Sequence, residues 1–309
     1  MNIELLVPLL AAAVQSGTPI LYATLGEMFT ERSGVLNLGV EGMMIVGALA
    51  AFLTAKFTGS PWLGLAAAGL AASAFSALHG LVCLWFLGNQ VVSGLALTIL
   101  GLGLADYLGT PFIGMPAPGF DRMSLPVLSE IPFFGPILFN QDMLVYISFL
   151  LPPLFWFFWN RTGLGLALSA AGEYPPASKA AGMNPVKHRW IGVMVGGFLC
   201  GLGGAYLSLA YTHLWTNGLT GGRGWIAVAL VIFAFWRPGR AVFGAYLFGG
   251  VMAFQMRLQA TGTNLPSSLL LMLPYALTIL VLVLSSLRSA DRARSAAPAA
   301  LAENIEPEE

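Results

Sequence analysis

The chain has 309 residues, of which 57% are hydrophobic and only 9% are charged, and its formal net charge is zero. A mean hydropathy of +0.78 is far from the values of soluble domains and is typical of a polytopic membrane protein. The charge balance gives no basic surface for nucleic acid, so we expect no nucleic-acid partner.

Apolar runs long enough to cross the bilayer recur along the whole chain, and a span needs about 20 residues. The sequence therefore predicts an all-α membrane domain over residues 1–287 with about nine transmembrane helices. The expected spans are 5–25, 35–55, 61–87, 90–110, 142–159, 189–212, 223–236, 239–256 and 266–287. The seventh and eighth are short and nearly contiguous, so a tilted or re-entrant arrangement stays open for them.

The second span carries polar and helix-weakening residues near its start, namely Asn37, Gly39, Glu41 and Gly42. These residues predict a helix broken near 37–40, with Glu41 at the N-terminus of the following half-helix, where free N–H groups favour an acid. Broken helices are tolerated in membranes where they are buried in protein or line a wet cavity. Two interpretations stay open: Asn37 and Glu41 line the cytoplasmic half of a translocation path, or Glu41 only ties two spans together.

Further polar residues open the fourth and seventh spans. Asn89, Gln90 and Ser93 begin the fourth span, where they either border the same path or cap a helix. Arg223 begins the seventh span at its outer end, and we expect it to snorkel to lipid headgroups rather than to receive an acidic partner.

The chain lacks the motifs of a membrane enzyme. It has no HExxH, no GxSxG, no Asp-rich motif and no His cluster, so we predict neither catalysis nor a metal site. It also lacks GxxxxGK[ST], and apart from Asp142 at the first position of a span, the acids inside the predicted spans are only Glu41 and Asp106. The energy for any transport is therefore expected from another chain, with a stand-alone secondary transporter as the alternative.

The distribution of basic residues predicts the orientation. Placing the N-terminus outside and the C-terminus inside puts ten basic residues inside and four outside, which fits the positive-inside rule. Residues 111–140, rich in Pro and Gly, then form an extracytoplasmic cap that folds back on the spans. Residues 288–309 form a cytoplasmic tail, basic near the membrane and acidic and disordered at its end.

The cytoplasmic loop at residues 172–185 has residues that typically begin and end a short helix. Gly172 can end one helix, Pro175 and Pro176 suit the first turn of the next, and Gly182 stops it before Asn184 and Pro185. The small residues between them leave an almost bare helix face. Such a helix is either an interfacial connector or a knob that fits a groove on a partner protein.

At this loop the sequence resembles a known family. AAGEYPPASKAAGMNP looks like the coupling loop of bacterial ABC-importer permeases of the branched-chain amino acid, ribose and nucleoside group. Other segments resemble the nucleoside and simple-sugar branch, in the right order along nearly the whole chain. They are ERSGVLNLGVEGMMIVGA (31–48), GNQVVSGLALTILGLGLADYL (88–108), IPFFGPILF (131–139), GGRGWIAVALVIFAFWRPGRAVFGAYLFGG (221–250) and LPYALTILVLV (273–283).

The resemblance implies a permease subunit in a bacterial inner membrane. It implies two ATP-binding subunits that hold ATP and Mg²⁺, an extracytoplasmic solute-binding protein, and a second permease chain, often a related but different one. No cofactor is expected in this chain. Carried over to this sequence, the coupling element consists of Glu173, Pro175, Pro176, Lys179, Ala180, Ala181 and Gly182. A modestly polar, nearly uncharged path would suit a neutral solute such as a nucleoside, a purine or a sugar.

Overall fold

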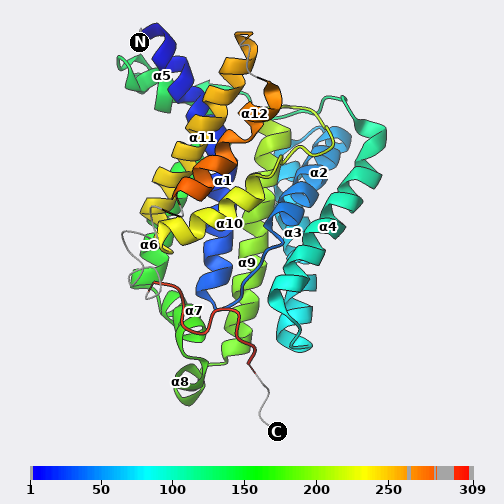
Figure 1. Ribbon diagram of the computed structural model, residues 1–309, viewed down its shortest axis with the longest axis vertical. Coiled ribbons are helices and arrows are strands. Elements are labelled where there is room, and N and C mark those ends of the chain that lie inside the picture. The colour runs from blue at the N-terminus through cyan, green and yellow to red at the C-terminus, as the bar shows by residue number, and fades with distance from the viewer. Residues whose placement is uncertain (1–2, 263–265, 282, 284–295, 306–309) are drawn as a thin grey trace.

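The computed structural model describes residues 3–262, 266–281, 283 and 296–305. Its long helices run between two ends of one bundle (Figure 1). The N-terminus and α5 (Phe134–Leu138) lie at one end, and α8 (Pro175–Ala180) lies at the other with the described C-terminal segment. The predicted cap and the predicted coupling loop therefore occupy opposite ends of the molecule.

Seven helices of the described residues are long and apolar enough to cross a membrane. They are α1 (Ile3–Arg32), α2 (Val40–Thr58), α3 (Pro61–Gly80) with a π turn to Trp85, α4 (Gln90–Gly109), α6 (Met143–Arg161), α9 (Pro185–Tyr206) with a π turn to Tyr211, and α11 (Pro238–Ala260). The helix at the predicted seventh span, α10 (Arg223–Ala234), has 12 residues and is too short to span by itself. The ninth predicted span begins with α12 (Ser267–Leu271) in an apolar helix that reaches Val281, and residues 282 and 284–287 of it lie outside the described residues.

The first span was predicted too short. Helix α1 continues past residue 25 to Arg32 and buries both Glu27 and Glu31 completely. The acids are tolerated there because Glu27 accepts a hydrogen bond from the Asn37 N–H at 3.0 Å, and Glu31 accepts one from the Trp236 indole at 2.6 Å. The predicted first span ended at residue 25, where its apolar run ends. The count of acids inside the spans therefore missed these two buried carboxylates.

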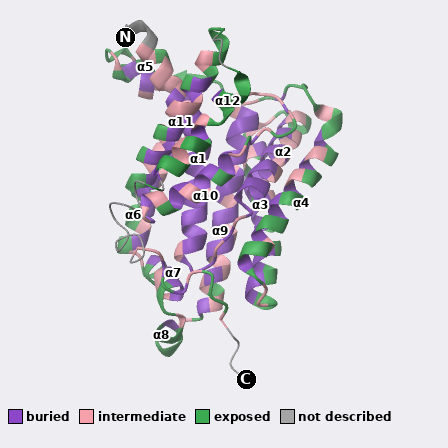
Figure 2. Cartoon of the chain, viewed as in Figure 1, coloured by how far each residue is buried: buried purple, intermediate pink, exposed green. Residues whose placement is uncertain are grey.

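Small residues let the central helices approach closely. A Cβ on Gly196 of α9 would lie 1.9 Å from Thr30 Oγ1 and 2.7 Å from the Gly26 carbonyl of α1. A Cβ on Gly201 would lie 2.4 Å from the Ala68 carbonyl of α3. Figure 2 shows the consequence, since α9 and α10 are largely buried while α4 and α8 present exposed residues. Close backbone contact replaces the hydrophobic effect as the source of helix association inside lipid.

The segment between α4 and α6 folds back on the bundle. Its short strands β1 (Arg122–Ser124) and β2 (Asn140–Asp142) pair antiparallel, and its Phe120 is buried. The Phe120 N–H donates to the Leu209 carbonyl at 2.7 Å, which fastens the segment to the end of α9. Asp142 caps α6 by accepting hydrogen bonds from the N–H groups of its first turn, and burial raises the pKa of this carboxyl.

Candidate translocation and coupling sites

Residues 33–39 form the non-helical break that precedes α2. Side chains of neighbouring helices satisfy its backbone: Leu36 donates its N–H to Gln90 Oε1 at 2.8 Å and its carbonyl lies 3.0 Å from His79 Nε2. The Leu38 carbonyl accepts a hydrogen bond from Thr98 at 3.0 Å. A broken span is stable inside a membrane only when its free backbone groups find such partners. No helical turn of the second span precedes this segment, so the structure has a non-helical entry to an unbroken α2 in place of the predicted broken helix, and the entry is enclosed by protein.

Asn37 closes the turn that starts α2. Its side-chain oxygen accepts the Gly39 N–H at 2.8 Å, and its own N–H donates to Glu27 of α1. The residue is fully buried, and its amide nitrogen lies 3.6 Å from Met43 Sδ. Asn37 thus bonds to the backbone groups that the break sets free, as the sequence indicated.

Glu41 lies in the first turn of α2 and also at the N-terminus of α10. Its carboxylate accepts hydrogen bonds from Thr220 Oγ1 at 2.5 Å, from the Gly222 N–H at 2.8 Å and from the Gly224 N–H at 2.6 Å. The free N–H groups and positive dipole end of α10 suit a carboxylate. This contact joins the first turn of α2 to the start of α10, about 180 residues away in sequence.

Two glycines make this contact possible. Gly222 has φ +79, a left-handed conformation that side chains rarely adopt. A Cβ on Gly224 would lie 2.5 Å from both the N and the Cα of Glu41. The close approach of α2 to α10 therefore requires glycine at positions 222 and 224 of the GGRG sequence (221–224). We call Glu41 with Thr220, Gly222 and Gly224 the α2–α10 junction.

The polar residues at the start of α4 divide into two groups. Gln90 and Ser93 face inward, where Gln90 holds Leu36 and Ser93 lies 3.0 Å from His79 Nδ1. Asn89 is exposed, and its side chain caps α4 by accepting the Val92 N–H at 3.0 Å. The structure thus brings Asn37, Gln90 and Ser93 around the break and leaves Asn89 at the surface.

Some buried polar residues were not found by the sequence reasoning. Glu27 and Glu31 lie one helical turn apart on α1, just beyond the apolar run that defined the first span. Their presence weakens the inference against an ion-coupled carrier that rested on the scarcity of acids. Arg223 was expected to reach lipid headgroups, but it is only 9% exposed and donates to the Thr220 carbonyl at 3.0 Å.

The short helix predicted within residues 172–185 is present as α8, after α7 (Gly163–Glu173). Pro175 and Pro176 occupy its first turn, and Gly182 follows it with φ +78. The coupling residues predicted here are exposed, except that Pro175 is half-buried: Glu173, Pro176, Lys179, Ala180, Ala181 and Gly182. The side chains of this face are mostly small, so a partner could approach its backbone closely.

Part of the C-terminal tail is ordered, contrary to the prediction of disorder for 288–309. Residues 296–305, here called the C-terminal strap, lie against the end of the bundle that carries α8. The Ala300 N–H donates to the Gly172 carbonyl at 3.0 Å, and the Ala302 N–H donates to the Gly34 carbonyl at 3.3 Å. The remaining residues of the tail lie outside those described.

Arg189 anchors the strap. This side chain is fully buried at the start of α9 and donates to the carbonyls of Ala171, Ala300 and Glu303. The strap could not be predicted from composition, because the alanines and acids of the tail are typical of a disordered terminus. The hydrogen bonds that hold the strap join it to Arg189, more than 100 residues away in sequence. No local sequence pattern indicates a contact at that separation.

The strap also contacts both the break and the coupling loop. Asn304 donates to the Leu87 carbonyl at 2.6 Å and accepts a hydrogen bond from Gln90 at 3.3 Å. Glu173 accepts the Ala299 N–H at 3.1 Å. A groove of about 570 Å³ separates the strap from α8. One side chain, Gln90, therefore contacts both the strap and the segment before α2.

Comparison with known proteins decides the family. Residues 9–282 match the family described as the permease component of branched-chain amino acid transport systems. The chain belongs to this family. The permease is thus a transporter component rather than an enzyme, and ATP hydrolysis is the task of a separate subunit. It is a multi-pass protein of the cell membrane whose family works with an ATPase and a solute-binding protein.

Three curated relatives cover most of the permease. It is 41% identical over 95% of both chains to a putative glucose ABC transporter permease protein of Haloferax volcanii. It is 35% identical to a guanosine ABC transporter permease protein of Bacillus subtilis, over 91% of this chain and 92% of the relative. It is 33% identical to a nucleoside ABC transporter permease protein of Lactococcus lactis, over 86% and 88%. No solved structure matches the chain.

Proposed function

We propose that the permease forms the membrane path for a small neutral solute of the nucleoside or simple-sugar class. A separate ATPase, which holds ATP and Mg²⁺, docks on α8 and drives the path between two conformations. A solute-binding protein delivers the solute at the opposite end, beside residues 111–140. The names of three relatives that match over 88–95% of their lengths support this solute class.

The observation that carries the proposal is the placement of α8. It projects from one end of the bundle with an exposed face of small residues and is continuous with α7 and α9. Glu173, just before α8, accepts a hydrogen bond from Ala299 of the strap, and Asn304 of the strap accepts one from Gln90 beside the break. A movement of α8 would therefore reach residues 33–41 through packed and hydrogen-bonded elements.

We assign the inner half of the path to the surroundings of the break. In this proposal Asn37, Gln90 and Ser93 shape the path, Asn89 borders its cytoplasmic side, and Glu41 keeps α2 and α10 aligned. All three of the hydrogen bonds to Glu41 Oε atoms come from the α10 side, which favours positioning over solute contact. A lining of neutral polar groups suits an uncharged solute.

We further propose that the second permease chain is a related but different protein. In Bacillus subtilis, two guanosine permease proteins match this chain, at 35% and 24% identity. In Haloferax volcanii, a putative glucose permease protein and a glucose permease protein match it, at 41% and 25% identity. Two unequal permeases that share one named solute in each organism support a heteromeric pair.

Reconstitution in liposomes tests the proposal. The permease is combined with the second permease, the ATPase and the solute-binding protein encoded with it, and uptake of radiolabelled guanosine and glucose is measured with ATP enclosed. We expect ATP-dependent uptake of one of these solutes and none with an ATPase that binds but cannot hydrolyse ATP. Uptake by the permease alone, driven by a proton or sodium gradient, would instead establish the secondary transporter.

A further inference from the structure

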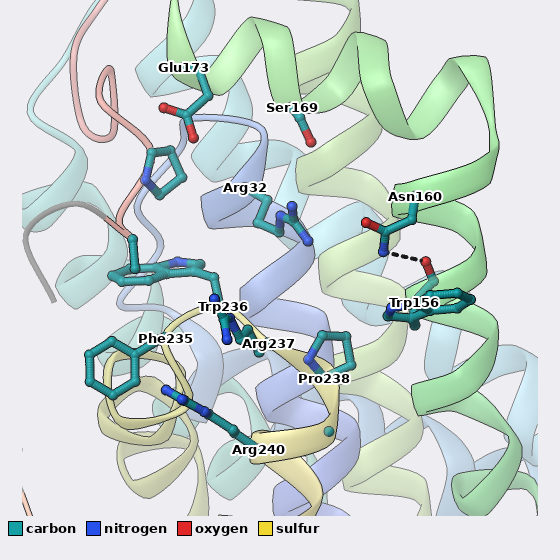
Figure 3. A pocket seen from close by; sticks show the side chains of 13 residues that line it. Arg32, Trp156, Asn160, Ser169, Glu173, Phe235, Trp236, Arg237, Pro238 and Arg240 are labelled. Carbon is teal, nitrogen blue, oxygen red and sulfur yellow. Dashed lines mark hydrogen bonds between the residues drawn. The ribbon is translucent and has the colours of Figure 1, made fainter. Parts of the chain in front are cut away.

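A cavity of about 700 Å³ opens beside the coupling loop, at the end of the bundle that carries α8. Its lining comes from α1, α6, α7, the turn between α10 and α11, the start of α11 and the strap, and Figure 3 labels Arg32, Arg237 and Arg240 among the lining residues. Its charged residues are Arg32, Arg237, Arg240 and Glu173, which leave a formal charge of +2 (three positive, one negative). No carboxylate of the described residues lies within ion-pair distance of these three guanidinium groups. The cavity therefore holds an excess of positive charge.

The backbone that presents two of these arginines is strained. Phe235 and Trp236 are consecutive left-handed residues with φ +52 and +53. Residues with a Cβ keep this conformation only where their surroundings enforce it, and such strain gathers at functional sites. Here the Trp236 indole donates to Glu31 at 2.6 Å in the protein interior. The turn is thus built into the fold.

The turn sets Arg237 and Arg240 at the start of α11, a helix of 23 residues. A helix N-terminus carries partial positive charge and ordinarily favours acids. Two arginines at this position add to the dipole instead of compensating it. An anion in the cavity would relieve the repulsion, and guanidinium groups bind phosphate oxygens in a bidentate manner.

The wall of the cavity also faces an apolar surface. Trp156 of α6 lines it and is 55% exposed, and its neighbours Leu154 and Phe157 are also exposed. The Arg32 guanidinium lies 4.5 Å from the centre of the Trp159 ring. Arginine and tryptophan together at the end of a span mark the membrane interface, where basic pockets between helices hold lipid headgroups.

We propose that this cavity binds the phosphate-bearing headgroup of an anionic phospholipid. Arg237 and Arg240 contact the phosphate, Arg32 completes the positive surface, and the exposed face of α6 receives the acyl chains. The inference does not depend on the transported solute or on the ATPase. It places a lipid beside Glu173, at the point where the coupling loop meets the bundle.

Native mass spectrometry of the full-length permease in detergent tests the proposal. The protein is incubated with phosphatidylglycerol, with phosphatidylcholine or with inorganic phosphate alone, and bound ligand is counted. The variants are Arg237→Ala with Arg240→Ala, and Arg161→Ala as the matched control. Arg161 is exposed at the end of α6 and does not line the cavity. A lipid-free melting temperature for each variant checks that the fold is retained.

We expect retention of phosphatidylglycerol over phosphatidylcholine, a loss of about tenfold in the double variant, and no change in Arg161→Ala. Rescue by Arg237→Lys with Arg240→Lys would further support a charge-dependent site if the alanine pair proves unstable. Equal retention of both lipids, or retention unaffected by the double variant, would overturn the proposal. Binding of inorganic phosphate without binding of phosphatidylglycerol would also overturn it and identify a free-anion site.

Discussion

The α2–α10 junction and the surface around α8 are built on opposite principles. At the junction a buried carboxylate accepts three hydrogen bonds between backbones so close that glycine is required. Around α8 the residues are exposed, and a Cβ on Gly182 would meet nothing within 4 Å. The junction fixes one arrangement of α2 and α10, whereas the surface leaves room for another protein. The largest effects of mutation on folding should therefore come from the junction, and effects near α8 should concern binding.

Gly224→Ala should break the junction most severely. The new Cβ would lie 2.5 Å from the Glu41 backbone, so α10 or α2 must move, at a cost of about 3 kcal/mol or more, the upper end for overpacking. We expect a loss of folded permease and a lower melting temperature. Gly103→Ala is the control, since a Cβ on Gly103 would meet nothing within 4 Å. Equal stability of the two variants would show that the close approach is unimportant.

Glu41→Gln should weaken the same junction by a smaller amount. The amide nitrogen of Gln cannot accept a hydrogen bond, so either the Gly224 N–H or the pair of Thr220 and Gly222 loses its acceptor. We expect destabilisation of about 2 kcal/mol, the range of a hydrogen bond to a charged group. The exposed Glu130→Gln is the control.

The Gln variant also separates the two roles considered for Glu41. A variant that folds and assembles like wild type but fails to transport would favour a role in the path. A loss of stability in parallel with transport would favour the structural tie. Thermal unfolding and ATP-driven uptake, measured on the same preparation, distinguish them.

The features that the sequence could predict are those determined by neighbouring residues. Pro175, Pro176 and Gly182 bound α8 by their own backbone preferences, and Asn37 with Gly39 marks the break before α2. Run length likewise located most spans, because about 20 apolar residues are needed to cross a bilayer.

The features that escaped prediction depend on distant partners. Glu31 is buried because Trp236, 205 residues away, bonds to it, so a hydropathy window ended the first span too early. Arg189 is buried by carbonyls that include one from Ala300, and Ala300 gives no local sign of this contact. Pairings at such separation leave no periodic pattern in one sequence.

Arg189→Met tests whether the hydrogen bonds of Arg189 keep the strap in place on the bundle. The change leaves the carbonyls of Ala300 and Glu303 without their buried donor, which should cost about 1–3 kcal/mol locally. We expect faster hydrogen exchange in residues 299–304 with little change elsewhere. Lys187→Met, at an exposed position of the same helix, should leave exchange of the strap unchanged.

Ala180→Trp places bulk on the small face of α8 without disturbing the interior, because Ala180 is exposed. We expect normal yield and melting temperature but at least tenfold weaker co-purification of the ATPase, since a well-packed contact surface tolerates an added ring poorly. Leu166→Trp, exposed on α7, is the control for added bulk. Full ATPase binding by the Ala180 variant would move the docking surface elsewhere.

Lys179→Ala should have the smallest effect of the series, although the residue lies in the same helix. Lys179 is exposed, and an exposed ion pair contributes about 0–1 kcal/mol because water and salt screen it. We expect ATPase affinity to fall by less than about fivefold and the change to shrink as salt is raised from 50 to 500 mM, roughly the range over which screening becomes strong. Binding by titration at several salt concentrations measures this. A larger loss that persists in high salt would mean that the lysine becomes buried on docking, so that charge rather than close backbone approach dominates the α8 surface.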